Sequence, residues 1–405
     1  MTRKKITIIS MLLLAVFAFQ FCSKNDSTTT TVTTPPAVDP YAAIKATFGT
    51  KIDPTNLANY ANQTRPAYIG VKDNTGGNTI TNAKATLGRV LFYDKNLSID
   101  NTIACGSCHK QQFAFGDTAI ASKGVAGGTT ARHTMRLINA RYAIETKFFW
   151  DERAATLEAQ TTQPIQNHAE MGFSGTAGRP TITNLLAKLQ AIGYYNELFK
   201  FVYGDINVTE ARLQECLAQF VRSIQSFDSK YDAGRAQVPN DGAPFPNFTA
   251  QENNGKQIFL NAPVFDPAGN RIAGGAGCNG CHAAPEFDIA PNSGNNGIIG
   301  ILGASGIDIT ITRAPSLRDI TNRFGVENGP FMHTANLATL QNAIGHYNTI
   351  NIAPGNTNLD PKLRPNGQGQ KLNLTGAEMS ALAEFLKTLS GSNVYTDTKW
   401  SSPFN

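Results

Sequence analysis

The sequence has few cysteines, and almost none of them is free to form a disulfide. The chain of 405 residues contains six cysteines, and four of them belong to two copies of a Cys-x-x-Cys-His motif. The other two are Cys22 and Cys216. A disulfide framework is therefore excluded for the mature fold. Cys216 lies in an amphipathic pattern with Leu213, Leu217 and Phe220, so we expect it to be a small buried hydrophobic residue.

The chain also lacks a basic stripe interleaved with aromatic residues, which is the usual footprint of a nucleic-acid-binding surface. Lys and Arg number 35 and Asp and Glu number 30, which gives a net charge of +5. We therefore do not expect nucleic acid as a partner. Strand signals are scarce as well, with residues 306–312 as one short example.

Segments with helical period dominate the sequence instead. Thr375 and Glu378 form a capping pattern at the start of one such segment, and Thr209 begins another. The predicted helices span residues 82–93, 182–192, 209–227, 253–260, 337–347 and 375–389. These patterns predict a mostly α protein.

The N-terminus has the composition of a secretory signal. Basic residues precede an uncharged apolar run over residues 6–21, and Cys22 follows directly. We predict a signal peptide of the lipoprotein type over residues 1–22, with plain secretion as the alternative because Phe21 stands where a small residue is usual. Residues 23–40 are rich in Thr and Pro and predict a flexible tether. We expect a protein of the periplasm or cell envelope, anchored by lipidated Cys22.

The two Cys-x-x-Cys-His motifs carry the chemistry of the chain. Two thiols three positions apart reach the two vinyl groups of one porphyrin, and the next residue, a histidine, then points a ring nitrogen at the iron. A zinc site would need two more ligands near each motif. We predict two covalently bound haem c groups, attached by Cys105, Cys108 and His109 and by Cys278, Cys281 and His282.

Each motif follows a predicted helix, which suggests one repeated unit. Residues 237–248 contain three prolines and lie between the two units. We therefore predict two c-type cytochrome-like domains, each with one covalent haem, over residues 41–236 and 249–405.

The sixth ligand of each iron decides between catalysis and electron transfer, because an open position binds peroxide and a filled one favours electron transfer. The stretch 110–132 after the first motif has no His and no Met, so we expect the first haem to be open. Candidate ligands for the second haem are Met332, His333, His346 and Tyr347.

The sequence resembles the bacterial di-haem cytochrome c peroxidase family, which includes the MauG oxidases. The likeness covers nearly all of residues 83–390. Besides the two haem motifs, the shared segments are LGRVLFYD at 87–94, LS at 97–98, RHT at 132–134, FFWDER at 148–153, LEAQ at 157–160, EMG at 170–172, PSLR at 315–318 and GPFMH at 329–333.

The resemblance implies roles for three residues near the haems. Glu170 matches a distal glutamate that moves a proton between the two oxygens of peroxide. Gln160 matches a polar residue of the same pocket, and Trp150 matches a tryptophan between the haems that relays electrons. Without the resemblance, we would expect Glu170 to be a solvated acid at a helix end and Trp150 to be a core residue.

Two departures from the family pattern concern the iron ligands. Residues 123–130 contain no counterpart of the histidine that blocks the first haem in peroxidases that need reductive activation. Tyr347 stands fourteen positions after His333, where many family peroxidases have a methionine and MauG-type enzymes have a tyrosine. The resemblance thus implies Tyr347 as the second haem's ligand, with Met332 and His333 in the wall; His346 stays an alternative. A phenolate ligand stabilises high oxidation states of iron.

A calcium ion between the haems is a further open expectation from the resemblance. The matching carbonyls belong to Asn328 and Pro330, but His133 replaces the usual asparagine ligand, and histidine is a poor calcium ligand. His168 is expected to be a polar neighbour of the first pocket.

Together these features predict a peroxidase that reduces hydrogen peroxide to water at the first haem. Electrons would come from a small cytochrome or similar redox protein through the second haem. One alternative is a MauG-like oxidase acting on a protein or aromatic substrate. The other is a non-catalytic electron carrier, which would need two six-coordinate irons and an idle Glu170.

The motifs predict that two haems per chain remain bound after acid-acetone extraction, because thioether bonds do not dissociate. A pyridine haemochrome assay should count two haems in the native protein. Replacing Cys278 and Cys281 with alanine should lower the count to one. A count of one in the native protein would contradict the di-haem interpretation.

Overall fold

A computed structural model describes residues 39–69 and 72–404. The predicted signal peptide 1–22, the lipidation site Cys22 and nearly all of the tether therefore lie outside the described residues. From Pro40 onward the chain forms one compact unit. No helix in the described ranges is long and apolar enough to cross a membrane.

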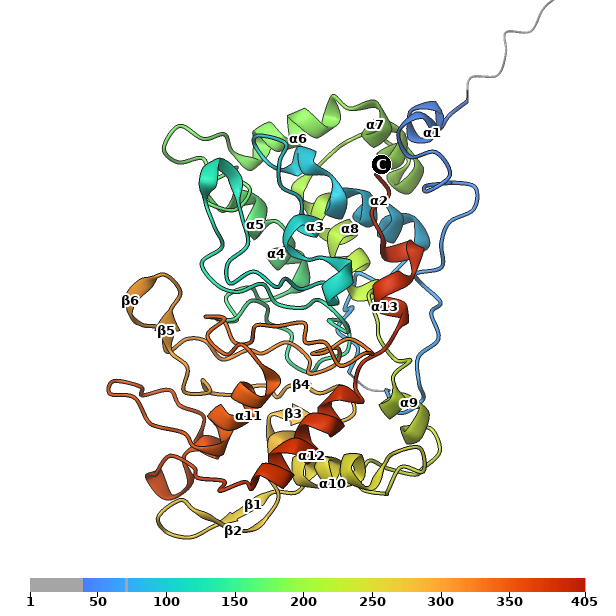
Figure 1. The fold of residues 1–405 in the computed structure, drawn as a ribbon. Helices are drawn as coiled ribbons and strands as arrows, with labels where there is room; N and C mark the ends of the chain where they lie inside the picture. The colour runs from blue at the N-terminus through green and yellow to red at the C-terminus, as the bar shows by residue number, and fades with distance from the viewer. Residues whose placement is uncertain (1–38, 70–71, 405) are drawn as a thin grey trace, which may run out of the picture. The chain divides into compact units, whose positions relative to one another are not determined.

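The described part of the chain is rich in helices, with short strands between them (Figure 1). The helices are α1 (Ala42–Phe48), α2 (Asn82–Tyr93), α3 (Cys105–Cys108), α4 (Leu157–Thr161), α5 (Gln163–Gln166), α6 (Ile182–Gln190), α7 (Gly193–Tyr203), α8 (Glu210–Ser223), α9 (Lys230–Arg235), α10 (Ala250–Leu260), α11 (Leu340–Asn348), α12 (Gly376–Lys387) and α13 (Asn393–Thr396). The strands form three antiparallel pairs: β1 (Pro263–Phe265) with β2 (Arg271–Gly274), β3 (His282–Ala283) with β4 (Asp288–Ile289), and β5 (Gly300–Ile301) with β6 (Ala304–Ile307).

All six helices predicted from the sequence are present, although their ends differ by a few residues. The predicted caps are confirmed: the Thr209 side chain accepts a hydrogen bond from Arg212 N, and Thr375 and Glu378 form a capping box at α12. The predicted strand at 306–312 is shifted, because β6 pairs with β5 across a tight turn at Gly303 and ends at Ile307. The hairpin of β1 and β2 and helix α7 were not predicted.

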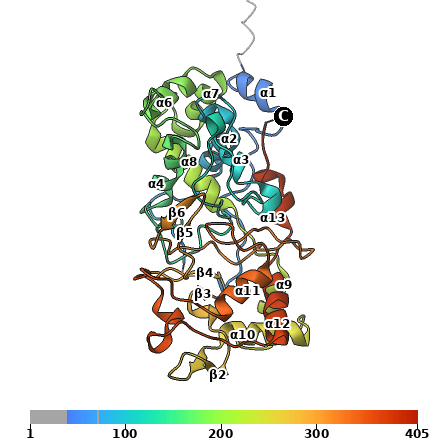
Figure 2. The same cartoon turned by 60° about the vertical axis from the view of Figure 1, so that its left-hand side comes forward.

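Each haem motif follows a helix that crosses a later helix at very close range. Helix α2 packs against α8, and α10 packs against α12, which lie side by side in Figures 1 and 2. A Cβ atom on Gly88 of α2 would lie 2.0 Å from the Cys216 carbonyl oxygen, and one on Gly255 of α10 would lie 1.9 Å from the Ala381 carbonyl oxygen. Only glycine allows these contacts, so the same packing rule operates in both halves of the sequence.

Two hydrophobic clusters surround these helix pairs. The first contains α2 and α8, with Cys216 fully buried as predicted, and the second contains α10 and α12. Val394 and Trp400 from the C-terminal segment belong to the first cluster. The domain boundaries proposed from the sequence stay a prediction, and the end of the chain packs with residues of the first predicted domain.

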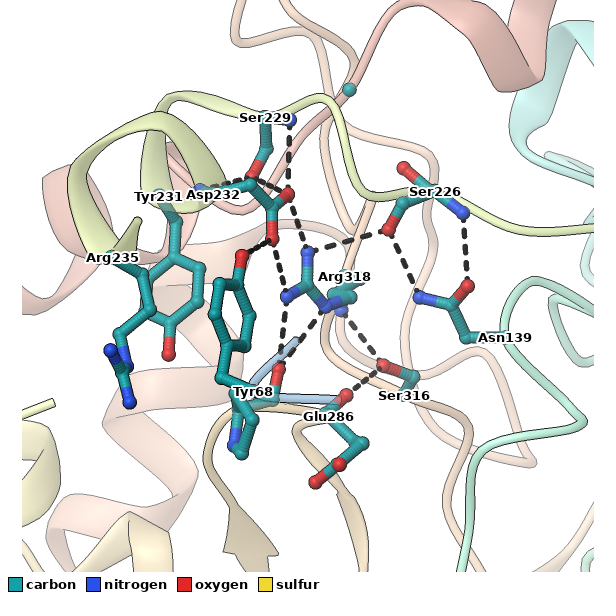
Figure 3. Close-up of polar contacts among 12 residues, drawn as sticks. Tyr68, Asn139, Ser226, Ser229, Tyr231, Asp232, Arg235, Glu286, Ser316 and Arg318 are labelled. Carbon is teal, nitrogen blue, oxygen red and sulfur yellow. Dashed lines mark hydrogen bonds and ion pairs between the residues drawn. The ribbon is translucent and has the colours of Figure 1, made fainter. Parts of the chain in front are cut away.

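A buried ion pair joins α9 to the segment that follows the second haem motif (Figure 3). The guanidinium of Arg318 is fully buried and donates to both carboxylate oxygens of Asp232, each at 2.9 Å. Asp232 also accepts from the Tyr68 hydroxyl at 2.7 Å and from the Ser229 hydroxyl at 2.6 Å. Burial would raise the pKa of Asp232, but the positive charge of Arg318 and these hydrogen bonds lower it below its usual value.

Replacing Asp232 with asparagine should destabilise the fold by about 3 kcal/mol, because the buried Arg318 charge would lose its partner. Chemical denaturation at neutral pH measures this change. Since the pKa of Asp232 is lowered in the folded state, the native pair's contribution should be full above the usual aspartate pKa and disappear as the pH falls through the lowered value.

The matched control is Glu384→Gln, which removes an exposed ion pair with Lys387. Its effect should stay below about 0.5 kcal/mol. Equal effects of the two substitutions would contradict a stabilising role for the buried pair.

Candidate functional site

The first motif lies in the wall of a cavity of about 520 Å³. Cys105, Cys108 and His109 all line this cavity, whose volume is within the roughly 300–1,000 Å³ range of ligand pockets. His109 Nδ1 lies 3.0 Å from the Phe115 carbonyl oxygen, which leaves Nε2 available to a metal. Burial lowers the pKa of His109, so the ring is neutral, as an iron ligand must be.

The second motif lies in the wall of another cavity of about 630 Å³, which Cys278, Cys281 and His282 line. Nδ1 of His282 is buried and has no hydrogen-bond partner among the described residues. Burial lowers the pKa of His282 to about 4, which keeps this ring neutral too. None of the four motif cysteines forms a disulfide with another described residue. The donor atoms and the two cavities therefore fit two covalently attached haems.

Glu170 and Gln160 both line the first cavity, as the sequence comparison implied. Gln160 belongs to α4. Glu170 lies in a turn, and its backbone N–H donates to the side-chain oxygen of Asn167 at 3.2 Å. In the described part of the chain, no side-chain hydrogen bond reaches the Glu170 carboxylate. Burial raises the pKa of Glu170, and the Arg153 charge opposes this only in part. A proton can therefore stay on this carboxyl at a higher pH than on an ordinary glutamate.

The loop 123–130, which carries no histidine, supports the Glu170 turn. Val125 N donates to the Glu170 carbonyl oxygen at 3.0 Å. A Cβ on Gly124 would lie 1.9 Å from the Ala169 carbonyl oxygen, and one on Gly128 would lie 2.5 Å from the same atom. The glycines allow the loop to pack directly on the turn that presents the carboxyl. Their presence was the only sequence signal for this contact.

The fold brings further candidate iron ligands to the first cavity. His133, Met135 and Met171 line it, although none of them lies in the stretch 110–132 from which an open first haem was predicted. His133 Nδ1 lies 2.9 Å from the Ala119 carbonyl oxygen. His168 is exposed, bonds to Ser174 and does not line the cavity. The open first haem stays a prediction.

Trp150 lies at the boundary of the two cavities and lines both of them. Its indole N–H donates to the His133 carbonyl oxygen at 2.7 Å. The His133 N–H in turn donates to the His333 carbonyl oxygen at 2.8 Å, and the rings of Trp150 and His333 are 6.1 Å apart. Backbone N–H groups of Thr312 and Arg313 donate to the Trp150 carbonyl oxygen. These contacts hold the indole where the two cavities meet.

Two of the candidate ligands for the second haem meet at one side chain. The Asn296 amide nitrogen lies 3.1 Å from the Tyr347 hydroxyl and 3.2 Å from the Met332 sulfur, and all three residues line the second cavity. His346 does not line this cavity, and its Nε2 lies 2.8 Å from the Asn296 carbonyl oxygen. Burial raises the pKa of Tyr347 to about 12. Asn296 was not singled out in the sequence.

The residues expected near a calcium ion make contacts with the protein itself. The Asn328 amide donates to the Asp319 carbonyl oxygen and to the Tyr395 hydroxyl, both at 2.8 Å. Within residues 39–69 and 72–404, no group of three or more His, Cys, Asp or Glu side chains is arranged to hold a metal ion. Calcium stays an open prediction.

Comparison with known proteins identifies relatives of two kinds. The di-haem cytochrome c peroxidase family model matches residues 82–237. The methylamine utilization protein MauG of Methylophilus methylotrophus is 29% identical over 329 residues, which cover 78% of this chain and 84% of that protein. The cytochrome c551 peroxidase of Nitrosomonas europaea is 25% identical over 318 residues, covering 76% and 80%.

Solved structures show the same similarity in three dimensions. A MauG-like protein associated with microbial copper homeostasis aligns with a TM-score of 0.65 and 26% identity, over 84% of this chain and 99% of that one. The diheme peroxidase BthA of Burkholderia thailandensis has the same fold, with a TM-score of 0.60 and 21% identity over 85% and 90%. With two Cys-x-x-Cys-His motifs in two cavities, the chain is similar to the di-haem cytochrome c peroxidases and MauG proteins in both sequence and fold.

Proposed function

We propose that the protein reduces hydrogen peroxide to water in the first cavity and receives the electrons through the second. The observation that carries this proposal is the position of Glu170 in the wall of the cavity lined by Cys105, Cys108 and His109, where no side chain of the described residues is hydrogen-bonded to its carboxyl group. A pure electron carrier has no use for such a group. The cytochrome c peroxidases among the relatives are oxidoreductases, which agrees with this class of reaction.

The bound haems supply the iron at which peroxide binds and the electrons that reduce it. One hydrogen peroxide takes up two electrons and two protons and gives two water molecules. The Glu170 carboxyl oxygens can accept the proton of the bound oxygen and return it to the oxygen that leaves as water. The raised pKa of Glu170 suits this exchange, because the group must both take and give a proton near neutral pH. The Gln160 amide on the same wall can orient peroxide by hydrogen bonding.

Electrons reach the first cavity past Trp150 in this proposal. The indole lines both cavities, so it would contact the groups bound in each of them. The donor would be a small cytochrome or similar redox protein that delivers electrons singly. We place the reaction in the periplasm or cell envelope, where c-type haems are attached and to which the predicted signal peptide would direct the chain.

Steady-state turnover of peroxide with a reduced small cytochrome tests the proposal, with Glu170→Gln as the decisive variant. Turnover should fall roughly 10²–10⁴-fold, because the amide keeps the shape but cannot carry the proton. Peroxide binding, followed by the visible spectrum, should persist. Glu384→Gln removes a carboxylate that lines neither cavity and pairs with Lys387, so this variant should turn over normally.

The pH dependence gives an independent check on Glu170. Burial raises the pKa of Glu170, so its carboxylate form is lost earlier as the pH is lowered. Native turnover should therefore fall on acidification at a higher pH than the pKa of an ordinary glutamate would give. The glutamine variant should lack this acidic limb. No turnover by the native protein, with both haems low-spin, would return the chain to the electron-carrier alternative.

A MauG-like oxidase is the second candidate, and the position of Tyr347 favours it. The Tyr347 hydroxyl lies in the second cavity at hydrogen-bond distance from Asn296. A phenolate ligand would hold the second haem at a low potential and favour its oxidised states. Such a centre suits withdrawal of electrons from a protein or aromatic substrate.

Tyr347→Met tests this candidate because it replaces the phenolate with a thioether. The second haem's reduction potential should rise, whereas the spectrum of the first haem should stay unchanged. Oxidation of a protein substrate should be lost while peroxide reduction survives. Met332→Leu is the matched control at the same Asn296 amide, and it should leave both spectra unchanged. If only Met332→Leu changes the second haem, Met332 is the ligand; if neither does, His346 becomes the candidate.

A further inference from the structure

Arg136 lies at the junction of the two cavities and lines both of them. It lies three residues after His133, whose carbonyl oxygen accepts the hydrogen bond from the Trp150 indole. On its other side, the Arg136 side chain passes close to Gly116, which follows the first haem motif. From this position, the Arg136 side chain can contact a group bound in either cavity.

The guanidinium of Arg136 has few partners within the protein. One terminal nitrogen donates to the Ser316 carbonyl oxygen at 3.2 Å, and the buried Nε has no hydrogen-bond partner among the described residues. No carboxylate of the described chain lies within ion-pair distance of it. The other arginines at this boundary differ: Arg132 pairs with Asp151 and Asp308, and Arg313 pairs with Asp288.

Asp319 is close enough to Arg136 to interact with its charge, but its hydrogen bonds are made to other residues. One carboxylate oxygen accepts from Gly391 N at 2.9 Å and from the Tyr395 hydroxyl at 3.2 Å. The other oxygen is buried without a partner, and burial raises the pKa of Asp319 to about 6. Burial lowers the pKa of Arg136 to about 10, and the nearby Tyr395 and Asp319 oppose this only in part, so the guanidinium is still charged at neutral pH. A guanidinium with a buried Nε and no ion pair among the described residues is costly, so its partner is expected from outside the polypeptide.

We propose that Arg136 binds propionate carboxylates of both haems and serves as their shared counter-charge. This inference rests on the haem occupancy in the proposed function, but not on peroxide turnover. A guanidinium presents five N–H donors in a planar fork, and only one of those of Arg136 is used by the protein in the described contacts. Carboxylates are its best-matched partners. A positive charge at this junction favours the reduced state of each iron, so one residue raises the reduction potentials of both haems.

Spectroelectrochemical titration of the holoprotein tests this role, with Arg136→Gln removing the charge. Both reduction potentials should shift downward, because the carboxylates lose their counter-charge. Arg136→Lys should shift both in the same direction but less, since lysine keeps the charge and loses the fork. Arg323→Gln removes one positive charge from an exposed side chain that stacks on Phe324, and it should leave both potentials unchanged.

Unpaired propionates also take up protons more readily, so the potentials of the glutamine variant should become more pH-dependent than those of the native protein. A shift of only one haem would overturn the shared role, and unchanged potentials would overturn the proposal entirely. If Arg136→Gln does not retain both haems in the pyridine haemochrome assay, Arg136→Lys takes its place: a downward shift of both reduction potentials supports the proposal, and unchanged potentials overturn it. Peroxide turnover is measured separately, so a protein with shifted potentials and no peroxidase activity would refute the proposed function alone.

Discussion

The hydrogen bond from the Trp150 indole to the His133 carbonyl oxygen ties together the segments that separate the two cavities. His133 is in turn bonded to the backbone of His333, which comes from the other half of the sequence. The Trp150 backbone is itself fixed, because its carbonyl oxygen accepts hydrogen bonds from Thr312 and Arg313. One indole and the Arg136 guanidinium, which makes no ion pair with the described residues, therefore lie where the two cavities meet.

The two halves reach this boundary by the same packing rule. In each, the helix before the haem motif crosses a later helix at a glycine, Gly88 in α2 and Gly255 in α10, where a methyl group would collide with a carbonyl oxygen. Such close crossings give each half its own hydrophobic cluster and leave room beside the motif for a prosthetic group. The halves differ in what faces the cavity. The first presents an unpartnered carboxyl at Glu170, and the second presents the Tyr347 hydroxyl next to the Met332 sulfur. In the proposed function, this difference would separate a site for proton chemistry from a site for electron transfer.

Much of the local structure follows from short-range rules. Period and capping residues located all six predicted helices, because their apolar faces and N-caps depend on residues only three or four positions apart. Contacts between distant segments leave no such periodic trace. The support of the Glu170 turn by Val125, and the meeting of Asn296 with Tyr347, join residues about 45 and 51 positions apart through one hydrogen bond each.

The two Cys-x-x-Cys-His motifs could be recognised from the sequence, since the two thiols and the histidine of each lie within five consecutive residues. The helix-rich character and the resemblance to the di-haem peroxidases also followed from the sequence. Only the tertiary structure decided which side chains face each cavity, that Trp150 and Arg136 touch both, and that His346 is turned to a backbone carbonyl while Tyr347 lines the second cavity. The physical reason is that a cavity wall is assembled from many separate segments, and their relative placement depends on packing and burial across the whole fold.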